Sequence, residues 1–337
     1  MKLNVHNTFD PLLEVIVGAV SSSFVDDDMP AKKRAIVEQV VAETAEDLDN
    51  IAKTLQNFGV SVFRPDSDID FGKPCSTPFV NTEGTKVPLS PRDIMFCYDD
   101  TMVITALAEH NRLFESMCYT DIIKSYLQQD SHVVSMPMPR LDCDTFENVS
   151  DDFAYYNNDF PLVAAANFQK YGKDILYSAY ETINQSAVKW LKRQMGNDYR
   201  FHAMPLPVRG HIDAHINILK PGVLSTSIHP KRLPECFKNW QVISETNTAQ
   251  TATPQLFSEH LQDDDWENTN LMANMFNIDE ENVLVYNTTS SDVMRQLDRA
   301  KINAVPVQFR HTHFLNQGIT CITLDTVRKG NLEDYEL

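Results

Sequence analysis

Apolar runs and helical periodicities alternate along most of this chain. The run Leu13-Glu-Val-Ile-Val17 is typical of a buried strand. Apolar residues at near-helical spacing then predict a long helix from about residue 31 to residue 58, with Gly59 as its stop signal. A short strand is predicted directly after it, at 60–63. The chain therefore opens with a strand, a long helix and a second strand.

The same order of short strands around one helix recurs further along the chain. The other predicted strands lie at 94–97, 102–105, 132–134, 199–204 and 305–309, and the other predicted helices at 111–128, 184–195 and 290–300. The repeat is one of pattern and not of sequence, so it indicates an α/β fold whose strands pair inside several similar units. Since no Gly/Ser-rich linker divides the chain, we expect a single domain over residues 1–337.

Composition and charge narrow the class of protein. The 337 residues, 42% of them hydrophobic, are enough to bury a large core. A formal charge of −18 disfavours nucleic acid and anionic membrane surfaces as partners and slightly favours a cationic substrate. No stretch approaches the roughly 18 apolar residues of a membrane helix, and the N-terminus lacks the apolar segment of a signal peptide. We therefore expect a cytoplasmic protein without a membrane partner.

The six cysteines are dispersed and form no Cys-x-x-Cys pair. This argues against a zinc knuckle and against a disulfide framework, so most of them are expected to be small buried residues. Cys321 lies close to a glycine and to small polar residues, which is consistent with a loop in which its thiolate is accessible. Asp93 begins another predicted strand, where a turn or N-cap role is equally consistent with the sequence.

One segment, at 209–219, concentrates polar groups. Alternation of polar with apolar residues predicts a strand with four polar side chains on one face: His211, Asp213, His215 and Asn217. A solvent-facing edge strand would explain this pattern. So would a non-haem iron site, in which His211 and Asp213 would be joined by His260 or His311. The pattern alone leaves these alternatives open.

Taken together, these segments resemble the glycine amidinotransferase family of guanidino-modifying enzymes, which includes the inosamine-phosphate amidinotransferases. The resemblance extends from about Leu12 to Tyr335. It rests on five landmarks, namely Leu13-Glu-Val-Ile-Val-Gly18, Pro91-Arg-Asp-Ile94, Ala165-Ala-Asn-Phe168, His211-Ile-Asp-Ala214, and Cys321 with Val327-Arg-Lys-Gly330. Their order and spacing are specific as a set, although each one alone is weak.

The resemblance implies a fold and a set of roles. The fold would be the pentein fold, in which five strand-and-helix modules surround a pseudo-fivefold axis and the active site lies in the central channel. Carried over by position, Cys321 would be the nucleophile and His211 the acid and base, while Asp93 and Asp213 would hold the guanidinium of the substrate. No metal or cofactor is implied, and a homodimer is a common state in the family.

The chain departs from the family pattern at several of these positions. The family motif Asp-Ala-Ala-Asp-Phe is here Ala164-Ala-Ala-Asn-Phe168. Ala164 therefore replaces the acid that orients the catalytic histidine, and Asn167 replaces a second acid of the pocket. His229 stands where the family uses an arginine for the carboxylate of the donor. These departures predict an altered substrate.

The function expected from the resemblance is amidino transfer from an arginine-like guanidino donor to an amine acceptor. The reaction would pass through an S-amidino-cysteine at Cys321. If water takes the place of the amine, the same site is a guanidino hydrolase. If the missing acid abolishes turnover, the chain is a weakly active member that only binds a guanidino ligand.

Overall fold

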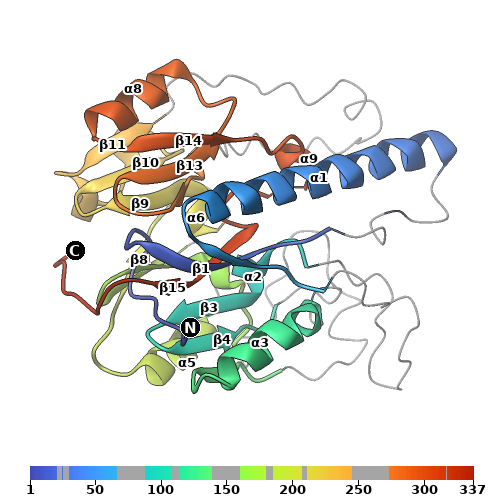
Figure 1. The fold of residues 1–337 in the computed structure, drawn as a ribbon. Helices are drawn as coiled ribbons and strands as arrows, with labels where there is room; N and C mark the ends of the chain where they lie inside the picture. Colours follow the sequence, from blue (N-terminus) through green and yellow to red (C-terminus); the bar gives the residue numbers. More distant parts are fainter. Residues whose placement is uncertain are drawn as a thin grey trace.

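The structure is a computed structural model of the whole chain (Figure 1). It describes residues 1–20, 25, 30–66, 88–107, 112, 114–138, 160–179, 185–206, 211–244, 273–315 and 317–337. Within these ranges the strands form five separate three-stranded sheets, and helices lie around them.

Every sheet has the same internal connectivity. Its first strand pairs antiparallel with its second, and the second pairs parallel with the third. Four of the sheets follow one another along the chain: β3 (Met95–Tyr98), β4 (Thr101–Ile104) and β5 (His132–Ser135); β6 (Phe168–Tyr171), β7 (Asp174–Ser178) and β8 (Arg200–Met204); β9 (Ile216–Lys220), β10 (Val223–Thr226) and β11 (Gln241–Ser244); and β12 (Phe276–Asn277), β13 (Asn282–Tyr286) and β14 (Asn303–Val307).

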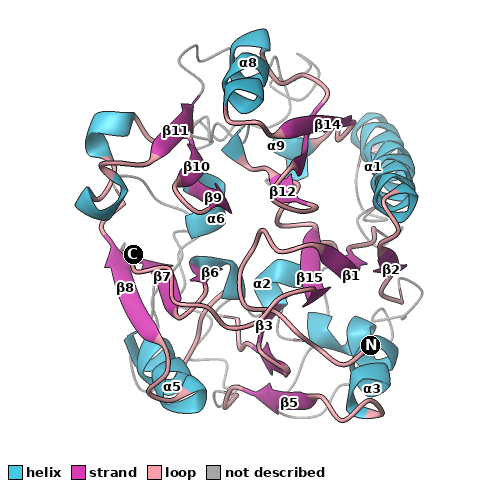
Figure 2. Ribbon diagram, turned by 60° about the vertical axis from the view of Figure 1, so that its left-hand side comes forward, coloured by secondary structure: helices cyan, strands magenta, loops and turns pink. Residues whose placement is uncertain are grey.

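The two ends of the chain complete the fifth sheet. In it, β15 (Thr323–Arg328) pairs antiparallel with β1 (Leu12–Val17), which pairs parallel with β2 (Ser61–Phe63). Figure 2 shows the sheets arranged as a ring, with the longer helices on its outer side. The five-module fold expected from the resemblance is therefore confirmed.

Helices connect the parallel strands, as such crossovers require. They are α1 (Ala31–Asn57), α3 (Thr120–Leu127), α5 (Gln185–Met195) and α8 (Ser291–Arg299), while two short 3₁₀ turns, η5 (Pro230–Arg232) and η6 (Glu235–Phe237), occupy the corresponding place between β10 and β11. The longest of these helices, α1, buries Leu48, Ile51 and Leu55 against the sheet of β1. No helix in the described ranges is both long enough and apolar enough to span a bilayer.

The helix predicted at 111–128 is wrong in its first half. The chain forms a 3₁₀ turn, η3 (Glu115–Tyr119), before α3 begins at Thr120, and residues 111 and 113 lie outside the described residues. The physical reason is the side chain of Glu115, which is buried and bonded to the guanidinium of Arg112. The spacing of apolar residues along the sequence gives no sign of such a buried ion pair.

Each module begins with a short turn directly before its first strand. Three of these turns are helical, namely α2 (Pro91–Ile94) before β3, η4 (Ala165–Asn167) before β6, and α6 (Ile212–His215) before β9. Residues 273–275 precede β12 and residues 319–322 precede β15. The turn η4 packs against both α2 and α6, and α2 also packs against β15. Figure 2 shows α2, α6, β12 and β15 near the middle of the ring, so these turns carry the residues that meet there.

Candidate active site

The segment at 211–219 does not form the single strand that its alternation predicts. It forms the helical turn α6 at 212–215, and only then the strand β9. The side-chain amide of Asn217 donates to the carbonyls of Asp213 (2.7 Å) and Ala273 (3.0 Å), and the first of these bonds caps the turn. The predicted polar strand face is therefore wrong: Asp213, His215 and Asn217 are all buried, and His215 is bonded to Ser227.

Asp213 faces the turn that carries Cys321. Its Oδ2 atom accepts a hydrogen bond from the Thr320 hydroxyl at 2.7 Å and lies 3.7 Å from the Cys321 Sγ, which donates its thiol proton to it. The two residues come from different modules, 108 positions apart. The fold therefore brings together the predicted nucleophile and one predicted guanidinium-binding carboxylate.

An asparagine that the sequence did not single out holds this contact in place. Asn274 is fully buried; its amide donates to Thr320 Oγ1 (2.6 Å) and to the Asp213 carbonyl (3.1 Å), and its carbonyl accepts from the Thr320 N–H (2.7 Å). Gly318 is needed beside it, because a Cβ atom there would lie 2.3 Å from Asn274 Oδ1. These bonds fix the carboxylate and the cysteine turn relative to each other.

Cys321 is buried, with 6% of its surface exposed, so the accessible loop thiolate expected from the sequence is wrong. Burial raises the pKa of the Cys321 thiol well above its ordinary value, and the charges of Asp213 and Asp93 raise it further. Burial likewise raises the pKa of Asp213, against the opposing influence of His211 and Arg92. These surroundings therefore favour the protonated thiol of Cys321.

Asp93 and His211 lie on neighbouring turns. Asp93 is almost completely buried on α2, and its Oδ2 atom pairs with Arg112 Nη1 at 3.0 Å. Its Oδ1 atom lies 3.5 Å from the Nδ1 atom of His211, which immediately precedes α6 and is 29% exposed through its side chain. This distance is that of an ion pair and is longer than a normal hydrogen bond.

Three buried oxygen atoms at these turns lack a hydrogen-bond donor in the described part of the chain. They are Asp93 Oδ1, Asp213 Oδ1 and Asn167 Oδ1. Asn167 is the last residue of η4 and is 3% exposed. Leaving buried acceptors unpaired is unfavourable, and more so when they carry charge. A ligand with several N–H donors and a positive charge would satisfy them.

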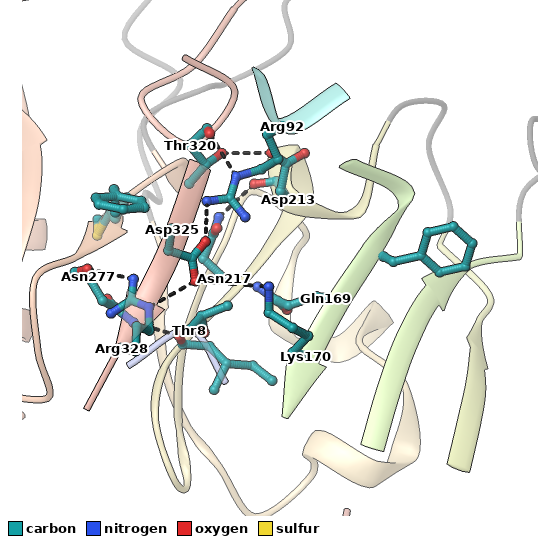
Figure 3. Close-up of a pocket in the computed structure, with 14 residues that line it drawn as sticks. Thr8, Arg92, Gln169, Lys170, Asp213, Asn217, Asn277, Thr320, Asp325 and Arg328 are labelled. Atoms are coloured by element: carbon teal, nitrogen blue, oxygen red, sulfur yellow. Dashed lines mark hydrogen bonds and ion pairs between the residues drawn. The ribbon is translucent and has the colours of Figure 1, made fainter. Parts of the chain in front are cut away.

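A cavity beside this site is lined by Asp213 and Thr320 and, further along, by Arg92, Lys170, Asp325 and Arg328 (Figure 3). The carboxylate of Asp325 pairs there with Arg92 (2.9 Å) and Arg328 (2.9 Å), and Lys170 Nζ lies 3.9 Å away. Burial opposes ionisation of Asp325, but Lys170, Arg328 and Arg92 outweigh it and lower the pKa of this carboxyl. Arg92 Nε also donates to the carbonyls of Thr320 and Thr323, so this cluster ties α2 to the cysteine turn.

His229 lies apart from these contacts. It is exposed and caps η5, where its Nδ1 atom accepts from the Lys231 N–H at 3.3 Å. No hydrogen bond or ion pair joins it to the other candidate residues within the described ranges.

The non-haem iron site considered from the sequence requires His260 or His311 as a ligand beside His211 and Asp213. His260 lies outside the described residues, and His311 bonds to Glu43 at 2.8 Å. Among the residues that the structure describes, no three His, Cys, Asp or Glu side chains are grouped to hold a metal ion.

Known proteins share both the sequence and the fold. The inosamine-phosphate amidinotransferase 1 of Streptomyces glaucescens is 27% identical over 99% of both chains, and the mitochondrial glycine amidinotransferase of Danio rerio is 26% identical over 98% of this chain and 84% of that protein. The solved structure of the inosamine-phosphate amidinotransferase StrB1 of Streptomyces griseus superposes with a TM-score of 0.80 at 26% identity, covering 99% of both chains. No family model matches the chain.

A wider likeness defines the class of the fold. The dimethylarginine dimethylaminohydrolase (DDAH) of Pseudomonas aeruginosa, at 14% identity and a TM-score of 0.58, covers 93% of this chain. This chain is thus a pentein-fold protein of the α/β class. More narrowly, it is similar over nearly its whole length to amidinotransferases, among them the inosamine-phosphate and glycine enzymes.

Proposed function

We propose that this protein is an amidinotransferase that moves an amidino group from a guanidino donor to an amine acceptor, with Cys321 as its nucleophile. The observation that carries the proposal is the pair of buried, donor-less carboxylate oxygens, Asp93 Oδ1 and Asp213 Oδ1. A guanidinium carries one positive charge and several N–H donors in a plane, which is the complement these oxygens lack. Amidinotransferase relatives that span nearly the whole chain support the same reaction.

Binding of the cation would activate the nucleophile. Burial and the charges of Asp213 and Asp93 hold the pKa of the Cys321 thiol high. A guanidinium seated on those two carboxylates neutralises part of that charge and adds a positive one, which favours the thiolate. The thiol proton passes to His211. The cysteine therefore becomes more reactive when a donor is bound.

The first half-reaction forms a carbon–sulfur bond. The Cys321 thiolate attacks the central carbon of the guanidinium to give a tetrahedral adduct. The carbon–nitrogen bond to the alkyl amine then breaks, His211 gives its proton to the departing nitrogen, and an S-amidino-cysteine remains.

The second half-reaction reverses these events. The acceptor amine attacks the amidino carbon, its proton passes to His211, and the carbon–sulfur bond breaks to regenerate the cysteine. Two carboxylates that fix the guanidinium beside the sulfur would convert a bimolecular encounter into an oriented one.

Intact-mass spectrometry tests the proposal. The protein is incubated with arginine, agmatine or guanidine hydrochloride, quenched in acid, and examined for the mass of one added amidino group, which peptide mapping should assign to Cys321. The Cys321→Ser variant should give no adduct. Cys236→Ser, which removes an exposed cysteine outside the site, should give the same adduct as the parent. Absence of an adduct with all three donors would refute the proposed function.

Discharge of the adduct distinguishes a transferase from a hydrolase. Glycine or lysine added to the isolated adduct should restore the free cysteine and yield a new guanidino compound. If the adduct decays equally fast in buffer and releases urea, the acceptor is water and the transferase assignment is wrong.

A further inference from the structure

The residue that orients His211 is not evident from the sequence. The family acid that orients this histidine is replaced by Ala164, whose side chain has no group to accept a proton. In a Ser-His-Asp triad, disabling the orienting acid costs about 10⁴-fold in rate, because the imidazole then adopts the wrong tautomer. A family member with an intact mechanism therefore needs a substitute.

Asp93 is the acid placed to act as that substitute. Among the described residues it is the one whose carboxylate lies within ion-pair distance of His211, with Oδ1 3.5 Å from Nδ1. Asn167, on the turn that follows Ala164, does not bond to the histidine, since its Oδ1 atom has no donor in the described part of the chain. Catalytic hydrogen bonds are often long in empty sites and shorten when the ligand binds.

The environment of Asp93 holds it in the required orientation. Arg112 binds its other oxygen, Oδ2, at 3.0 Å and is itself held in a two-bond pair by the buried Glu115 (3.0 and 3.1 Å). The charges of Arg112 and Glu115 offset each other, so this pair adds little net charge beside Asp93. With Oδ2 engaged, Oδ1 is the atom left to face both the histidine and the ligand.

We propose that Asp93 orients His211 in place of the acid lost at position 164, and that Arg112 is the positioning residue that fixes Asp93 for this task. The proposal rests on the proposed function, in which His211 transfers protons. It gives Asp93 a second duty beside contact with the guanidinium, and it predicts that the Nδ1 atom of His211 carries the proton while Nε2 is free to act as the base.

A double-mutant cycle between positions 93 and 164 tests the proposal. The variants are Asp93→Asn, Ala164→Asp and the double variant, and the readout is the single-turnover rate of adduct formation with the fastest donor at saturation. Because Asp93 already orients His211, Ala164→Asp alone should change the rate by less than about threefold. In the Asp93→Asn background, the same change should raise the rate at least about tenfold, since non-additivity marks residues that share a task.

The opposite pattern would overturn the proposal. If nothing orients His211 in the parent, Ala164→Asp alone should raise the rate by about a hundredfold or more. If Asp93 only contacts the guanidinium, Ala164→Asp should give no rescue of the rate in the Asp93→Asn background, because a carboxylate at 164 acts on the histidine and not on the bound ligand.

A second measurement does not depend on turnover. In protein labelled with ¹⁵N-histidine, the neutral His211 ring of the parent should show a protonated Nδ1 and an unprotonated Nε2. Asp93→Asn should shift His211 toward the other tautomer, and Arg112→Met should do so in part.

Asp174 offers a matched control for this measurement, because it is a buried aspartate bonded to both a histidine (His202, 2.7 Å) and an arginine (Arg200, 2.7 Å) outside the site. Asp174→Asn should alter the His202 signals and leave those of His211 unchanged. Identical His211 signals in the parent and in Asp93→Asn would overturn the proposal even if the amidino adduct forms. If the parent forms no adduct, the proposed function fails, while these spectra still decide the Asp93–His211 pairing.

Discussion

Replacement of Asp213 with asparagine separates the electrostatic role of this residue from its binding role. The change keeps the side-chain shape and removes a negative charge 3.7 Å from the Cys321 sulfur. At that separation two unit charges interact by about 4 kcal/mol at an effective dielectric constant near 20. The actual gain is smaller, because burial raises the Asp213 pKa and so reduces its mean charge. We therefore expect the pKa of the Cys321 thiol to fall and its thiolate to become more abundant.

Two rates should then change in opposite directions. Alkylation of Cys321 by iodoacetamide at pH 8 should become roughly 10 to 100 times faster in Asp213→Asn, since each 1.36 kcal/mol corresponds to a factor of ten. Amidination of the same cysteine should become slower, because the guanidinium loses one of its two carboxylates. Time-resolved mass spectrometry of the Cys321 peptide measures both rates. Asp292→Asn, which removes an exposed carboxylate on α8, should leave both rates unchanged.

An alkylation rate that is unchanged or slower in Asp213→Asn would refute this account of the thiol. It would mean that access to the buried sulfur, and not the charge of Asp213, limits its reactivity. Circular dichroism and thermal unfolding of the variant should match those of the parent, which excludes disturbance of the turn that carries Cys321 as the cause of a slower rate.

The remaining predictions concern the scaffold of the site. Asp325→Asn leaves three buried cations without their carboxylate, so the free energy of unfolding at pH 7 should fall by about 3–5 kcal/mol in urea denaturation, against about 0–1 kcal/mol for Asp292→Asn. Because folding lowers the pKa of Asp325, its contribution is present above the unfolded pKa of about 4 and should be lost as the pH falls below it, so the parent should lose stability in acid and Asp325→Asn should lose less. Gly318→Ala should displace Asn274 and reduce the rate of adduct formation about tenfold or more, whereas Gly59→Ala, at a site with no atom within 4 Å of the new Cβ, should leave that rate unchanged.

Several strands and most helices could be predicted, because the burial of their side chains shows in the local pattern of apolar residues. Examples are the apolar runs at β1, β3 and β4 and the helical periodicity of α1, α5 and α8. The turn α6 could not be predicted in this way. Alternating polar and apolar residues over four positions fit a strand. The helical turn is closed instead by the bond from the Ile216 N–H to the Ile212 carbonyl and by the bond from the Asn217 amide to the Asp213 carbonyl.

Several site residues carried no sequence signal of their own. Asn274 is one polar residue in an ordinary segment, and its importance comes from bonds to two other modules. Arg112 lies 19 positions after Asp93 and belongs to no recognisable motif. Its role follows from the ion pair that it forms with Asp93 on α2. Thr320 and Arg92 adjoin the predicted residues Cys321 and Asp93, so adjacency was the one clue that could have found them. The burial of Cys321 was also hidden, since the side chains that cover it come from elsewhere in the chain.

The ring architecture explains why the chemistry is distributed in this manner. In each module a short turn near the centre of the ring precedes the first strand. A side chain on such a turn can contact other modules without interrupting the hydrogen bonds of its own sheet. The proposed nucleophile Cys321 and the carboxylates of Asp93 and Asp213 therefore lie on different modules, and Arg92 and Asn274 bridge those modules by hydrogen bonds to Thr320. A substitution on one turn can then be offset from another turn facing the same centre. Alanine at position 164, where the resemblance implies an acid, and the closeness of Asp93 on α2 to His211 fit this arrangement, because η4 packs against both α2 and α6.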